Sequence, residues 1–67
     1  MEWESGFTIA VRLDGGAAVI SANREGLLSL AKLMKELAGE TPGSHAHLDQ
    51  YNGLEDGSVE LIVERIE

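Results

Sequence analysis

Apolar and polar residues alternate in the first part of the chain. Side chains two positions apart on a strand share one face, so this period predicts a half-buried strand over residues 7–13. Its apolar face consists of Phe7, Ile9, Val11 and Leu13. Asp14-Gly15-Gly16 follows, and glycine supplies the positive φ angles that a tight hairpin turn needs. Residues 17–21 are therefore expected to return as a second strand.

The middle of the chain changes to a helical period. Apolar residues recur every three or four positions, which is typical of a helix that buries one broad stripe. The stripe comprises Leu27, Leu30, Ala31, Met34, Leu37 and Ala38, and it is widened by Leu28 and Leu33. Ser21 or Asn23 is expected to cap the start of the helix. Gly39 is placed to cap its end, and Pro42 prevents its continuation.

Two more strands are expected after the helix, over residues 44–50 and 58–66. Asn52-Gly53 and Asp56-Gly57 lie between them, and both are strong turn dipeptides. The order strand, strand, helix, strand, strand predicts one α+β domain over residues 1–67. In that domain a single helix covers one face of a four-stranded, largely antiparallel sheet. Residues 1–6 are expected to form a flexible start.

The opposite face of that sheet has no element in the sequence to cover it. Antiparallel sheets commonly leave one face in water. The face would carry Thr8, Arg12, His45, His47, Glu60, Ile62 and Glu64. The apolar side chains of Ile62 and Ile66, together with Trp3, have no obvious place in the core, which indicates a contact surface.

Composition limits the partners. The chain has 67 residues, no cysteine, and a formal net charge of -7 from 12 acidic and 5 basic residues. Such a surface repels nucleic-acid phosphate and anionic lipid, and suits either a cationic protein partner or simple solubility. No apolar run approaches the roughly 20 residues of a membrane span, and the start lacks a signal-peptide pattern. We therefore expect a cytoplasmic protein with neither a nucleic-acid nor a membrane partner.

His45, His47 and Asp49 alternate and would share one face of the third strand. Two imidazoles and a carboxylate can bind a metal ion, and Glu60 or Glu64 could complete the shell if the last two strands pair. The alternative is a polar outer face on which histidine pairs with glutamate across strands. Because no other histidine exists to supply a third nitrogen, metal binding is the weaker hypothesis, and we predict no cofactor.

Catalysis and recognition make different demands on the same residues. Ser44 adjoins His45, but neighbouring strand residues face opposite sides and cannot form a dyad there. A two-layer domain of this size also offers little room for a substrate pocket of roughly 300 Å³, so we expect no enzyme activity. In the loop after Gly53, Leu54 is flanked by carboxylates. It is either an exposed interface anchor or a residue that tucks under the sheet.

A longer set of residues resembles a known family. It comprises SANREGL from Ser21, LLSLAKLMKELA from Leu27, GSHAHLD from Gly43 and GLEDGSVELIVE from Gly53. Over residues 21–66 the chain is similar to the immunity protein 32 family of bacterial polymorphic toxin systems, although Ala46 replaces the bulkier apolar residue of other members. The resemblance implies a small intracellular antitoxin that binds and neutralises a cognate toxin without catalysis.

Three hypotheses about function therefore stand. The leading one is the immunity protein, with candidate contacts at His45, His47, Asp49, Leu54, Glu55, Asp56, Glu60 and Glu64. The second is a small metal- or ligand-binding domain that uses the face of His45, His47 and Asp49. The third is a structural homodimer that buries the bare sheet face.

Overall fold

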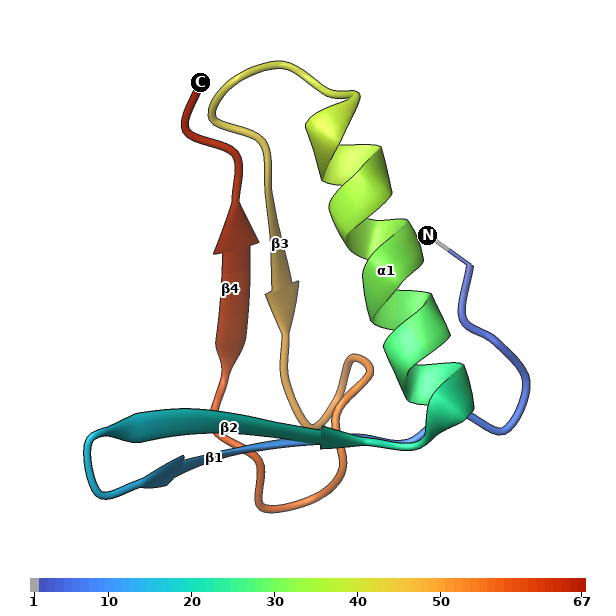
Figure 1. Cartoon of the computed structure of the whole chain (residues 1–67), viewed down its shortest axis with the longest axis vertical. Helices are drawn as coiled ribbons and strands as arrows, with labels where there is room; N and C mark the ends of the chain where they lie inside the picture. The colour runs from blue at the N-terminus through green and yellow to red at the C-terminus, as the bar shows by residue number, and fades with distance from the viewer. Residues whose placement is uncertain (1) are drawn as a thin grey trace.

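The chain folds as two β-hairpins joined by one helix. A computed structural model describes residues 2–67, and Met1, part of the expected flexible start, lies outside the described residues. The elements are β1 (Ile9–Asp14), β2 (Ala17–Ala22), α1 (Arg24–Ala38), β3 (His45–Leu48) and β4 (Leu61–Glu64). In Figure 1, α1 runs alongside the β3–β4 hairpin, and the β1–β2 hairpin crosses one end of both. The predicted α+β class is confirmed.

The first hairpin forms where the alternating pattern places it. Strands β1 and β2 pair in antiparallel register, with Ile9 opposite Ala22 and Asp14 opposite Ala17. Gly15 in the turn has a φ of +63°, which favours glycine. Leu13 was expected on the buried face, but its side chain is 70% exposed. The reason is that the turn end of this hairpin projects beyond the rest of the molecule (Figure 1).

Asn23 fixes the start of α1 to the strand before it. Its Oδ1 accepts hydrogen bonds from the Gly26 N–H at 2.7 Å and the Thr8 N–H at 2.9 Å. Its Nδ2 donates to the Gly6 carbonyl at 2.9 Å. Of the two candidate caps Asn23 is therefore the one used, whereas Ser21 lies in β2 and accepts from Arg12. The predicted cap at Gly39 is also confirmed.

The helix buries part of the predicted stripe, since Leu30, Leu33 and Leu37 are buried as expected. Its buried residues are Gly26, Ser29, Leu30, Leu33 and Leu37. Leu27 and Met34, expected to be buried, are 56% and 47% exposed. At Gly26 the helix lies close to the start of β1, and a Cβ atom there would overlap the Thr8 carbonyl oxygen. This close approach turns the Gly26 side of the helix inward and leaves the Leu27 side in water.

The predicted four-stranded sheet is wrong, because the hairpins form two separate two-stranded sheets. The loop between β3 and β4 occupies the second edge of β1. The Glu55 N–H donates to the Ile9 carbonyl at 2.8 Å, and the Val59 N–H donates to the Val11 carbonyl at 3.0 Å. The Ser58 hydroxyl accepts the Val11 N–H at 3.1 Å. With this edge occupied, β4 cannot pair with β1 and begins only after the loop has left that edge.

One hydrophobic core joins both hairpins, the helix and the loop before β4. Its buried apolar residues are Ile9, Val11, Leu30, Leu33, Leu37, Leu48 and Leu54. They come from β1, α1, β3 and the loop before β4, so the loop contributes to the core as well as to the β1 edge. Within residues 2–67, no helix is long and apolar enough to cross a membrane.

The segment before β1 contacts the rest of the molecule through Trp3, Glu4 and Phe7. The Trp3 and Phe7 rings stack with centroids 4.6 Å apart. The Glu4 N–H donates to the buried Ser29 hydroxyl at 2.8 Å, and the Glu4 carboxylate lies 2.8 Å from the Lys32 ammonium. Hydrogen bonding to this carboxylate raises the pKa of Lys32. The segment therefore covers one flank of α1.

Candidate functional site

The β3–β4 hairpin presents a polar outer face. His45 lies opposite Glu64, and His47 lies opposite Ile62. Directly paired residues of antiparallel strands point the same way, so these four side chains share one face, and all four are exposed. We call this set, together with Glu60, the polar face. The predicted face also included Thr8 and Arg12, but Arg12 lies in β1 and Thr8 directly before it, and β1 forms a separate sheet with β2.

The histidines make contacts typical of a solvated strand face. His47 Nδ1 lies 3.3 Å from Glu60 Oε2, and both side chains are exposed. His45 Nδ1 lies 3.1 Å from the Gly43 carbonyl oxygen. The two rings meet edge to face with centroids 5.0 Å apart. An exposed contact of this kind contributes at most about 1 kcal/mol, so it shapes the surface more than it stabilises the fold.

Asp49 does not join the two histidines. Its carboxylate accepts the Tyr51 N–H at 2.8 Å, and its carbonyl accepts the N–H groups of Asn52 and Leu54 at 2.9 Å each. The residue therefore builds the turn that ends β3. Among residues 2–67, no three His, Cys, Asp or Glu side chains are grouped so that they could hold a metal ion. The histidine pair thus lacks the third ligand that the metal hypothesis requires.

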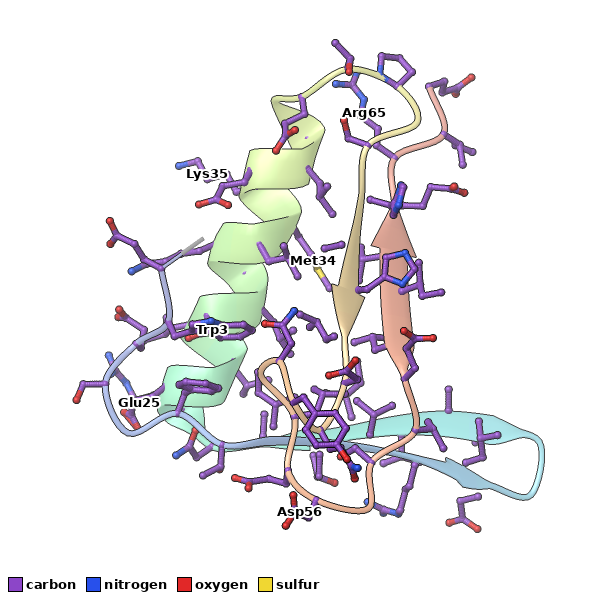
Figure 2. The ribbon with its side chains drawn as sticks, turned by 180° about the vertical axis from the view of Figure 1, so that it is seen from behind. Trp3, Glu25, Met34, Lys35, Asp56 and Arg65 are labelled. Carbon is purple, nitrogen blue, oxygen red and sulfur yellow. The ribbon has the colours of Figure 1, made fainter. Side chains whose placement is uncertain are left out.

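The loop candidates are divided between the core and a second surface patch. Leu54 is buried in the core, so the expectation of an exposed anchor there is wrong and the alternative of a tucked residue is confirmed. Glu55 and Asp56 are exposed. In Figure 2, Asp56 lies at the end of the molecule opposite to Arg65. The acidic loop is therefore separate from the C-terminal end of the hairpin.

Sequence reasoning missed a groove between α1 and β4. Its volume is about 410 Å³, and it is shallow and largely open to solvent. It is lined by Met34, Leu37, Ala38, Val63, Glu64, Arg65 and Glu67. The signal that could have found it is the width of the apolar stripe on the helix, which exceeds what one face can bury.

Arg65 ties the end of the hairpin to the end of the helix. Its Nη1 donates to the Ala38 carbonyl at 3.0 Å and also to the Glu40 carbonyl, and its Nε donates to the Glu67 carbonyl at 2.8 Å. A cation at this position satisfies carbonyls that a helix C-terminus leaves unpaired. The charge of Arg65 is therefore directed at the backbone, and Glu67 lines the same groove.

Comparison with known proteins gives one finding. Residues 18–66 match the family model described as Immunity protein 32. The match covers more than half of the chain and includes α1, the polar face and every residue that lines the groove except Glu67. No curated protein and no solved structure matches the chain.

Proposed function

The chain belongs to the immunity protein 32 family, and from this premise we propose that it binds a cognate bacterial toxin and neutralises it by protein–protein contact, without catalysis. The match over residues 18–66 is the observation that carries the proposal. The net charge of -7 supports a cationic partner, because opposite charges steer two proteins toward encounter. The proposed place of action is the cytoplasm of the cell to be protected.

The polar face supports a binding role. Ile62 is 52% exposed and lies opposite His47, so an apolar side chain stands among imidazoles and carboxylates. Interfaces commonly combine an apolar centre with a charged rim in this way. We propose that His45, His47, Glu60, Ile62 and Glu64 contact the toxin. The exposed Glu55 and Asp56 form a second acidic patch, and Asp49 acts by holding the turn.

The side chains that could begin a reaction have other neighbours. The Ser44 hydroxyl lies 3.4 Å from the Thr41 hydroxyl, whereas His45 and His47 contact the Gly43 carbonyl and the Glu60 carboxylate. A nucleophile needs a base within hydrogen-bond reach. Ser44 and the two imidazoles are therefore better explained as parts of a binding surface than as a dyad.

The test is binding to, and protection from, the protein encoded beside this chain's gene. Its C-terminal domain should co-purify with the chain at micromolar concentration, and co-expression should restore growth of cells that produce it. Binding should weaken as salt rises, because salt screens charge steering. Failure to form a complex and failure to restore growth would together refute the proposal.

A charge-matched pair of variants tests the surface. Glu60→Lys on the polar face should weaken binding, because it removes the partner of His47 and places a cation opposite a cationic toxin. Asp14→Lys, at the exposed turn end of the first hairpin, changes the net charge equally and serves as the control. If both variants bind alike, only overall charge matters and the proposed contact at Glu60 is wrong.

A further inference from the structure

One flank of α1 is covered by the N-terminal segment, and the other flank is exposed. The N-terminal segment lies along one flank, where Glu4 bonds to Ser29 and Lys32, and Figure 1 shows it on the side of α1 away from β3. The other flank carries Leu27, Ala31, Met34 and Ala38, all exposed. Their spacing of four, three and four residues forms a continuous apolar stripe along the helix. We call these four residues the open stripe.

The open stripe leads into the groove. Met34 and Ala38 line the groove together with Val63 of β4. In the view of Figure 1, β3 lies between α1 and β4, and the residues that line the groove come from α1, β4 and the segment after β4. Val63 points to the same side as its partner Ala46, whose side chain is small, and both are only half buried. The inner side of β4 is therefore incompletely covered.

We propose that the open stripe and the groove form a docking site for an amphipathic, cationic helix of the toxin, which lies beside α1 and over β4. The proposal rests on the proposed function and names the surface and the chemistry of its partner. Large and small side chains alternate along the stripe as Leu27, Ala31, Met34 and Ala38, and the small ones let a second helix approach closely. The eleven steps from Leu27 to Ala38, at 1.5 Å each, give about 16 Å of contact, or three helical turns.

Charge selects a cationic occupant. Glu67 lines the groove, while the guanidinium of Arg65 donates to the Ala38, Glu40 and Glu67 carbonyls. Lys35 is the nearest lysine to Met34 along the chain, and Figure 2 shows the two on opposite sides of α1. Because the chain has a net charge of -7, it favours a partner helix with lysine or arginine beside its apolar face.

The same charges disfavour a second copy of the chain. Each copy carries a net charge of -7, so two copies that met at this groove would bring two strongly acidic molecules together. Like charges brought together at an interface oppose association. The homodimer is thus a competing occupant that an experiment can separate from a cationic partner.

The test uses the wild-type complex with the toxin domain described above. Met34→Glu should weaken its affinity at least tenfold, as expected for loss of a central apolar contact and addition of a carboxylate. Leu28→Glu, on an exposed α1 residue outside the open stripe, should bind within twofold of wild type. Thermal unfolding of both free variants checks that they fold.

A second measurement needs no substitution. The chain has two methionines, so selective methyl labelling gives two NMR signals, and the Met34 signal should shift when the toxin domain is added. If the complex forms but this signal stays in place and Met34→Glu binds normally, the docking site is wrong and the proposed function stands. If no wild-type complex forms, the proposed function fails first. If light scattering shows a dimer that Met34→Glu dissociates, a second copy occupies the site and the inference is overturned.

Discussion

Gly26→Ala tests the contact that sets the orientation of α1. A Cβ atom at Gly26 would overlap the Thr8 carbonyl oxygen and lie 2.9 Å from Ile9 Cγ1 and 3.0 Å from Ala22 Cβ. Carbon atoms in contact normally lie about 3.5–4.0 Å apart, so the helix must move by at least about 0.5 Å. The Ile9 side chain cannot move aside easily because Ile9 is completely buried, and the Thr8 oxygen cannot because it is part of the backbone.

Two effects of opposite sign determine the magnitude. Alanine is a better helix former than glycine by about 1 kcal/mol. Overpacking a well-filled core costs about 1–3 kcal/mol and occasionally more. Moving α1 also strains the hydrogen bond from the Asn23 N–H to the Thr8 carbonyl, which is worth about 1 kcal/mol. We therefore expect Gly26→Ala to lower the free energy of unfolding by about 1–3 kcal/mol, despite the gain in helix propensity.

Urea unfolding followed by tryptophan fluorescence measures this difference, because Trp3 is the one tryptophan of the chain. Gly16→Ala is the matched control. A Cβ atom at Gly16 has no neighbour within 4 Å, and the residue does not have a positive φ. The control should unfold within about 0.5 kcal/mol of wild type. Should Gly26→Ala prove as stable as Gly16→Ala, the close approach of α1 to β1 cannot be what orients the helix.

Other parts of the fold give three further expectations. Asn23→Ala should lower the free energy of unfolding by about 1–2 kcal/mol in urea titrations. Asn23→Asp should lower it less, because aspartate keeps the oxygen that accepts the two backbone hydrogen bonds. Equal losses of unfolding free energy in the two variants would mean that the accepting oxygen of Asn23 does not stabilise the fold. Arg65→Gln should lower the melting temperature by roughly 4–8 °C, since about 1 kcal/mol of bonding to the helix end is lost; an unchanged value would show those bonds to be dispensable. Micromolar zinc should produce no saturable shift of the His45 and His47 NMR signals, and saturable binding that His47→Ala abolishes would restore the metal hypothesis.

Local patterns predicted the local structure well. The period of two over Ile9 and Val11 gives β1, and the turn glycines fix its partner strand. Alternation also placed His45 and His47 on one outer face, because a strand points successive side chains to opposite sides whatever it pairs with. These features need only near neighbours in the sequence.

The remaining errors come from contacts between distant parts of the chain. Backbone groups of Glu55 and Val59 bond to β1, and a backbone bond leaves no mark in side-chain type, so a four-stranded sheet was the simpler prediction. The phase of α1 was misjudged because Gly26 has no side chain to signal burial, whereas Leu27 has a large apolar one. The groove was not predicted for the same reason, because it lies beside helix residues that were expected to be buried.

The bonds between β1 and the loop after β3 also determine when the domain can become stable. Val11 and Ser58 are 47 positions apart, and closing a chain segment of that length costs roughly 3–4 kcal/mol of entropy. Each hairpin and the helix can form before this closure. Until residues 55–59 arrive, however, the outer edge of β1 has free backbone groups that could pair with another chain. During refolding, aggregation should therefore be confined to this interval, and a high net negative charge keeps chains apart while it lasts.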